Sequence, residues 1–140
     1  MALHRNFCAK FHLTARDLEE TEPSPTTLGY SSFLLSIAQS GTVADILATI
    51  LPCFWGYMQI GERLAEASTP EAQPLYAEWI ATYTAPEYLE LCVWLRSLFD
   101  RLTLGARPDD LERYRRLFLT GSRYEYLFWE AARSLETWPV

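Results

Sequence analysis

The residues best suited to chemistry lie around a proline in the middle of a long apolar segment. Cys53 directly follows Pro52, and Tyr57 comes four residues later. In a helix, this spacing puts the thiol and the phenol on one face, one turn apart. Gly56 lies beside them and leaves room for another molecule to approach. The stretch from Leu51 to Tyr57 is therefore a candidate reactive site.

A second interpretation of Cys53 needs no chemistry. Free cysteine is among the most buried residue types, and a cysteine in an apolar helix is more often inert packing than a nucleophile. Together with Cys8 and Cys92 it makes an odd-numbered set that matches neither a disulfide framework nor a Cys-x-x-Cys metal pattern. The cysteines thus favour a reducing compartment, and both interpretations of Cys53 stay open.

A carboxylate among aromatic residues is the next candidate. Glu125 lies between two tyrosines, where a charge is costly unless it is paired or used. The same residue could instead lie on the wet side of an amphipathic helix, and the sequence alone does not decide. His4 and His12 lie in the N-terminal segment without nearby acids, so they support neither a Cys-His pair nor a metal site. Proton transfer would therefore fall to a carboxylate or a tyrosine.

Composition restricts the partners. The chain has 140 residues, enough for one domain with a single core, and a net charge of −6 with Lys10 as the sole lysine. Nucleic acids and anionic membranes both require a basic patch, so neither is expected as a partner. We find no signal peptide pattern, and Pro52, Gly56 or charges interrupt the longest apolar stretches. These features predict a soluble, cytoplasmic protein.

The spacing of apolar residues predicts five main helices and no strand. Ser24 and Thr42 are expected to cap the first two, with Asp45 in capping-box position behind Thr42. Gly121 is expected to be a soft point in the last helix. A short cap and turn is expected at Thr14, and the main helices at about 25–40, 43–67, 71 or 74 to 85, 87–104 and 108–136. We therefore predict an all-α bundle.

Four motifs together carry a resemblance to a known family. They are Tyr30-x-x-Phe-Leu-Leu-x-x-Ala-x-x-Gly, Leu51-Pro-Cys-Phe-Trp-x-Tyr-x-x-Ile-Gly, Tyr76-x-x-Trp-Ile-x-x-Tyr and Tyr124-Glu-Tyr-x-Phe-Trp. In this order and spacing they resemble the TenA, or thiaminase II, family over roughly the last three quarters of the chain. The resemblance implies a helical bundle of the haem-oxygenase-like type and a homotetramer. It also implies hydrolysis that releases hydroxymethylpyrimidine from aminomethylpyrimidine or thiamin, in thiamin salvage, with neither a metal nor an organic cofactor.

The resemblance also implies roles for individual residues. Cys53 falls on the family's nucleophile, a role that would suit an accessible thiol with a lowered pKa. Glu125 falls on the glutamate that contacts the substrate and moves protons. The residues implied to line the pocket and orient the pyrimidine ring are Tyr30, Tyr57, Tyr83 and Phe128.

The family pattern departs from this chain at the N-terminus. Relatives have N-terminal helices that supply a substrate-binding aspartate, and these would lie before Met1. We therefore expect residues 1–140 to form one domain equivalent to the C-terminal two thirds of the family fold. The true chain could be longer, a second polypeptide could supply the missing helices, or the chain could be a remnant. Alternatives to the hydrolase are a non-catalytic ligand-binding or regulatory module, a half-enzyme that needs a partner chain, and an assembly subunit whose exposed apolar faces associate.

Overall fold

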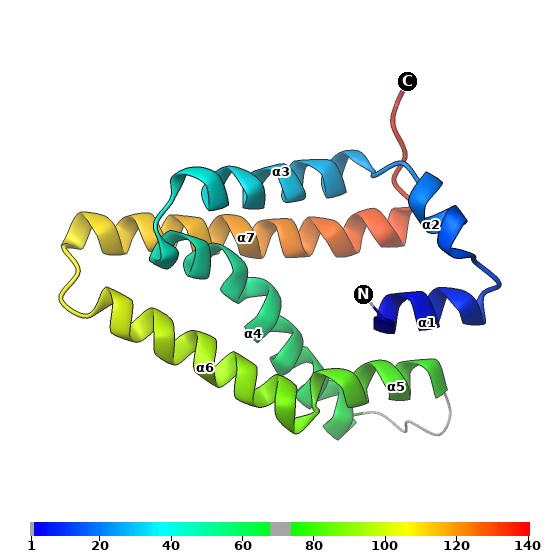
Figure 1. Cartoon of the computed structure of the whole chain (residues 1–140), viewed down its shortest axis with the longest axis horizontal. Helices are drawn as coiled ribbons and strands as arrows, with labels where there is room; N and C mark the ends of the chain where they lie inside the picture. The colour runs from blue at the N-terminus through cyan, green and yellow to red at the C-terminus, as the bar shows by residue number, and fades with distance from the viewer. Residues whose placement is uncertain (1, 68–73) are drawn as a thin grey trace.

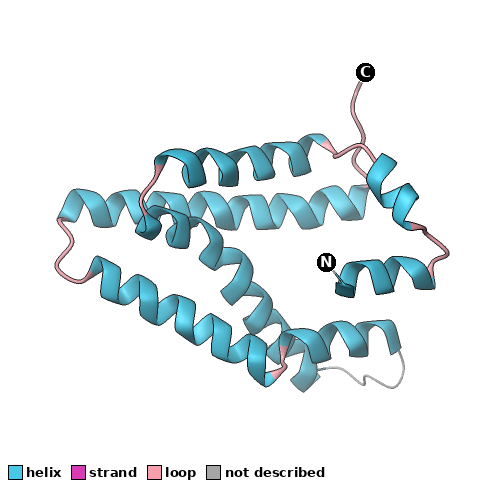
Figure 2. Ribbon diagram, in the orientation of Figure 1, coloured by secondary structure: helices cyan, strands magenta, loops and turns pink. Residues whose placement is uncertain are grey.

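The computed structural model describes residues 2–67 and 74–140, which form helices joined by short loops and contain no strand (Figures 1 and 2). The helices are α1 (Ala2–Lys10), α2 (Ala15–Glu20), α3 (Pro25–Ser40), α4 (Val43–Ala67), α5 (Pro74–Tyr83), α6 (Pro86–Thr103) and α7 (Pro108–Ser134). The all-α prediction is confirmed, and the five predicted main helices correspond to α3–α7. The alternative start of α5 at Glu71 lies outside the described residues.

α4 is the central helix of the bundle. α3 and α7 run side by side, and α4 crosses obliquely from their end toward α5 and α6 (Figure 1). Because α3, α5, α6 and α7 all contact α4, its apolar side chains supply most of the core. The core consists of Leu47, Leu51 and Leu95, with Ile50, Phe54, Leu98, Phe99 and Phe118 packed around them.

A capping box begins α4 and also ties this helix to α7. The backbone N–H and the hydroxyl of Thr42 both donate to Asp45 Oδ2 at 2.8 Å, and the Asp45 N–H donates to Thr42 Oγ1 at 3.2 Å. Arg113 of α7 donates to the other carboxylate oxygen of Asp45 at 2.8 Å. The predicted cap is therefore confirmed, and it also fixes α4 against α7. The caps expected at Ser24 and Thr14 are present as well.

By length and composition, α4 is apolar enough to cross a membrane, which the interruptions in its sequence did not suggest. Its packing explains this character, because four helices cover it and its buried residues include Leu47, Ala48 and Leu51. These contacts bury 39% of its apolar window.

α4 and α7 approach each other closely at Gly121. A Cβ atom on this residue would lie 2.7 Å from the carbonyl oxygen of Thr49 and 3.0 Å from Cγ of Pro52. α7 runs through this position without interruption. The prediction that Gly121 is a soft point is therefore wrong. This glycine is the contact that lets α7 pack against the proline of α4.

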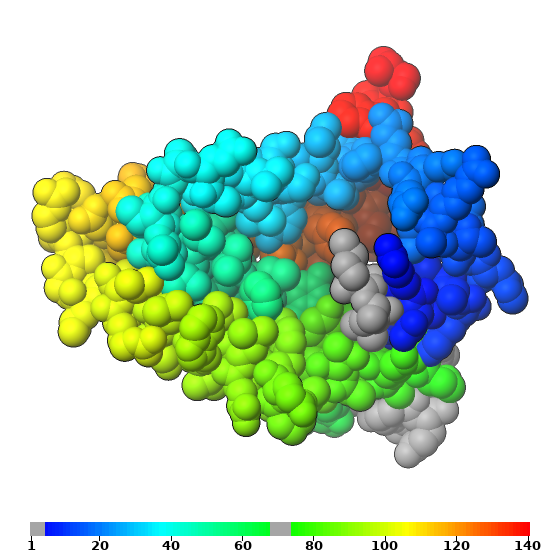
Figure 3. Space-filling model, in the orientation of Figure 1, coloured from blue at the N-terminus to red at the C-terminus, as the bar shows by residue number. Residues whose placement is uncertain are grey.

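The molecule exposes more surface than a compact protein of its mass. Its accessible surface is 9953 Å² at 16.2 kDa, whereas a compact monomer of this size exposes about 7,500 Å². Figure 3 shows a hollow below α3, with α7 at its floor. Exposed apolar side chains such as Trp94, which is 54% exposed, add to the accessible surface.

Candidate active site

Three helices bring a thiol, a carboxylate and a phenol together. Tyr30 of α3 donates from its hydroxyl to Oε1 of Glu125 on α7, at 2.5 Å. The same carboxylate also acts on the thiol of Cys53 on α4, because after burial its charge is the next cause that raises the pKa of this thiol. Three residues predicted as site residues from separate parts of the sequence therefore form one centre around Glu125.

Packing between α3 and α7 turns Glu125 toward the interior. The ring of Tyr30 stacks on Tyr124 with centroids 5.2 Å apart and nearly parallel planes, and Phe33 stacks on the same ring at 5.4 Å. Glu125 itself is half-buried. Of the two interpretations left open for this residue, the structure supports the paired carboxylate and not the solvated one.

The electrostatics of Cys53 differ from what its expected role suggested. Burial, followed by the charge of Glu125 and the hydrogen bond to it, raises the pKa of the Cys53 thiol to about 12. Burial and the bond to Glu125 also raise the pKa of Tyr30 above its ordinary value. The expectation of a lowered thiol pKa is therefore wrong for this structure. The Cys53 thiol therefore stays protonated near neutral pH, and the carboxyl group of Glu125 is its charged neighbour.

A cluster of rings lies next to this centre. The ring of Tyr57 contacts Tyr83 at 4.9 Å, Trp79 at 5.9 Å and Trp129 at 6.0 Å, measured between centroids. Burial raises the pKa of both tyrosines, so both remain hydrogen-bond donors near neutral pH. A Cβ added to Gly56 would meet nothing within 4 Å. The space expected beside Gly56 is therefore present.

Sequence reasoning missed three members of this cluster. Trp79 and Trp129 stand in the quoted motifs but were given no role. Tyr88 carried no signal, because no motif contains it. In the structure its ring lies edge-on to Tyr83 at 5.1 Å. Phe128 is 38% exposed and contacts the ring of Trp129, so its role as part of the substrate pocket stays a prediction.

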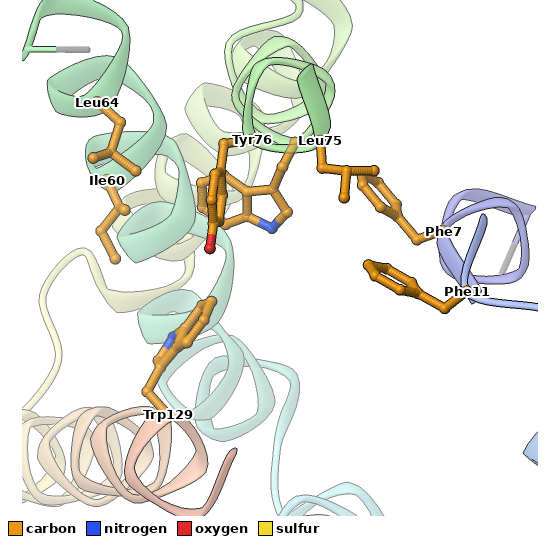
Figure 4. A pocket seen from close by; sticks show the side chains of 8 residues that line it. Phe7, Phe11, Ile60, Leu64, Leu75, Tyr76 and Trp129 are labelled. Carbon is orange, nitrogen blue, oxygen red and sulfur yellow. The ribbon is translucent and has the colours of Figure 1, made fainter. Parts of the chain in front are cut away.

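An apolar cleft of about 800 Å³ opens on the outer side of the cluster (Figure 4). α1, α4, α5 and α7 form its walls, and Trp129 and Tyr76 point into it from opposite sides. Its lining residues are Phe7, Phe11, Ile60, Leu64, Leu75, Tyr76, Trp79 and Trp129. Because Trp79 and Trp129 belong to both, the cleft and the ring cluster are continuous.

A cysteine, a glutamate and several tyrosines that meet inside a helical bundle are typical of a binding site for a small molecule. Comparison with known proteins identifies the class: residues 1–135 match the model of the TENA/THI-4/PQQC family. The chain belongs to this family. The resemblance inferred from the four motifs is therefore confirmed.

Individual relatives agree with this assignment. The chain is 37% identical to an aminopyrimidine aminohydrolase of Halalkalibacterium halodurans over 99% of its own length and 62% of that protein. It is 33% identical to an aminopyrimidine aminohydrolase of Bacillus subtilis, over 99% of its own length and 58% of that protein. A TenA homologue from P. horikoshii OT3 superposes with a TM-score of 0.81 at 33% identity, covering 94% of this chain and 60% of the other.

These matches confirm the haem-oxygenase-like helical fold. They also show that the chain spans about 60% of the length of the relatives it matches. That the unmatched part is N-terminal and supplies an aspartate stays a prediction.

Proposed function

We propose that this protein is a cytoplasmic hydrolase of the thiaminase II type, acting on aminomethylpyrimidine or thiamin in thiamin salvage. The observation that carries the proposal is the position of Glu125, which accepts a hydrogen bond from Tyr30 and raises the pKa of the Cys53 thiol. Membership of the family and the names of the two relatives support it. The substrate is a small pyrimidine, and the assembly is a homo-oligomer.

In this mechanism Cys53 is the nucleophile and Glu125 the acid and base. As the sulfur attacks a pyrimidine ring carbon, the thiol proton passes to Glu125, so no free thiolate is needed at rest. The C–N bond between the exocyclic methylene and the leaving amine or thiazole then breaks. Glu125 returns the proton to a leaving amine, whereas it releases the proton to solvent when the leaving group is the neutral thiazole. Water then adds to the methylene carbon and gives a proton to Glu125. The sulfur finally departs and recovers that proton, which frees hydroxymethylpyrimidine.

The tyrosines have supporting roles in this scheme. Tyr30 keeps its proton, because burial and Glu125 raise its pKa, and its hydrogen bond fixes the carboxylate in place. Tyr57 and Tyr83, whose rings contact each other, orient the flat ring by stacking and hydrogen bonding. Phe128 would extend this wall.

The test is pyrimidine release from aminomethylpyrimidine and from thiamin by the purified chain. We expect Cys53→Ser to lower kcat by about a thousandfold or more, since serine is close in size but a far weaker nucleophile at this position. Cys8→Ser, on α1, is the matched control and should keep full activity. Turnover that survives in Cys53→Ser would rule out this cysteine as the nucleophile.

A second candidate is a non-catalytic ligand-binding module, or a half-enzyme that needs a partner chain. The exposed surface of 9953 Å² favours it, because a surface larger than that of a compact monomer is available for a partner to cover. This candidate predicts that hydroxymethylpyrimidine binds, as measured by calorimetry, while neither substrate is turned over by the chain alone.

A further inference from the structure

Two side chains of α6 converge on one backbone carbonyl of α4. The Tyr88 hydroxyl donates to the carbonyl oxygen of Phe54 at 3.0 Å, and the Cys92 thiol donates to the same oxygen at 3.3 Å. Tyr88 and Cys92 are four residues apart, so they lie on one face of α6. Phe54 is the residue that follows Cys53, so both donors bind the backbone next to the thiol.

This part of α4 needs support from outside the helix. Pro52 has no backbone N–H to donate, and its ring crowds the preceding turn. α7 packs against Pro52 at Gly121, while α6 holds Phe54 through the two hydrogen bonds. The ring of Tyr88 also stacks on that of Phe54 at 6.3 Å. The turn that carries Cys53 is therefore held from two sides.

The same tyrosine reaches the ring cluster. Tyr88 packs edge-on against Tyr83 at 5.1 Å with an interplanar angle of 88°, and Tyr83 in turn contacts Tyr57 at 4.9 Å. Burial raises the pKa of Tyr88, so its hydroxyl stays a donor. One side chain thus fixes the backbone beside Cys53 and the ring that faces the proposed substrate.

We propose that Tyr88 is a positioning residue, assisted by Cys92, which aligns Cys53 with Glu125 through the Phe54 carbonyl. It acts through these neighbours and does not touch the reacting atoms. Neither residue falls within the motifs that carry the family resemblance. The inference rests on the proposed function for its effect on catalysis, but its effect on the thiol can be measured without a substrate.

The experiment compares Tyr88→Phe, Cys92→Ala and the double variant with the parent, all in the full chain with Cys8→Ser. Tyr88→Phe keeps the ring and removes the donor. We expect kcat to fall about tenfold while KM changes less than about twofold, because misplacement of a reacting group is costly. The double variant should lose more than the product of the single losses, since the donor left in each single variant still restrains the carbonyl in part.

The second readout is the pH profile of Cys53 alkylation by iodoacetamide, followed by mass spectrometry. Because Glu125 raises the pKa of the aligned thiol, misalignment should move the profile to lower pH. Tyr114→Phe is the control, since Tyr114 also packs edge-on against a ring of α6, that of Phe99 at 5.7 Å, at a distant point. It should change neither kcat nor the profile.

Each outcome has one meaning. A parent-like profile and kcat in Tyr88→Phe and in the double variant, even with a lowered Tm, would show that the two bonds only stabilise the fold and would overturn the inference. Absence of turnover in the parent would count against the proposed function instead, and the alkylation profile would still decide the positioning role. If the double variant does not fold, Tyr88→Phe alone decides.

Discussion

Two glycine-to-alanine substitutions in the interiors of neighbouring helices should change stability in opposite directions. At Gly121 the new methyl group would lie 2.7 Å from the Thr49 carbonyl oxygen and 3.0 Å from the ring of Pro52. At Gly56 it would meet nothing within 4 Å. Both positions lie within helices, so both gain from the higher helix propensity of alanine.

The magnitudes follow from these contacts. Alanine is favoured over glycine by about 1 kcal/mol in a helix interior, so Gly56→Ala should raise the free energy of unfolding by about 0.5–1 kcal/mol. At Gly121 the neighbours are a backbone carbonyl and a proline ring, neither of which can rotate away. Overpacking of this kind costs about 1–3 kcal/mol, so Gly121→Ala should show a net loss of up to about 2 kcal/mol once the helix gain is subtracted.

Urea unfolding followed by circular dichroism measures both changes. We expect the urea midpoint of unfolding to be higher than that of the parent for Gly56→Ala and lower for Gly121→Ala, with unchanged m-values. A stabilised Gly121→Ala would refute the close approach of α4 and α7. Gly56→Ala should also lose activity despite its added stability, because its methyl group enters the open space beside Cys53.

Three further predictions concern charge and surface. Glu125→Gln should slow turnover at least a hundredfold, because it removes the group that transfers protons. It should also move Cys53 alkylation to lower pH, because besides burial the charge of Glu125 raises the thiol pKa. An unchanged alkylation profile would contradict the pairing of the two residues. Asp45→Asn should cost about 1–3 kcal/mol in urea unfolding near neutral pH. Burial alone would raise the pKa of Asp45, but hydrogen bonds from Thr42 and Arg113 lower it from its ordinary value. The stabilising effect of this carboxylate is therefore present above about pH 4 and is lost in acid. The Asp45→Asn variant should accordingly lose less stability on acidification than the parent. Light scattering should give a mass that is a multiple of 16.2 kDa, and a strict monomer would contradict the proposed homo-oligomer.

The fold could be predicted because its signals are local. The capping box of Thr42 and Asp45 involves residues three apart, and the sequence is enough to locate it. The proline and glycine breaks between helices are equally local. The hydrogen bond from Arg113 to Asp45 could not be predicted, because the two residues lie 68 positions apart and only the packing of α7 on α4 brings them together.

The sequence was enough to name Cys53 and Glu125 as candidate site residues, but not to predict their interactions. The motifs indicated Cys53 and Glu125, yet nothing in the sequence showed that Tyr30 would donate to that carboxylate. The thiol pKa depends on how deeply Cys53 is buried and on the sign of the nearest charge, and both arise only when α4 and α7 pack. Tyr88 was missed for the same reason, because its partner is a backbone carbonyl that any residue could offer.

The contact at Gly121 links the fold to the chemistry. Glu125 lies four residues after Gly121 on α7, one helical turn on, and Cys53 directly follows the Pro52 that Gly121 touches. The tight packing of α4 on α7 at this contact therefore helps to set how far the carboxylate lies from the thiol. A larger residue at 121 would move the two apart along with the helices. Gly121 and Pro52 thus act as a pair. Together they position Cys53, the proposed nucleophile, and Glu125, the proposed acid and base.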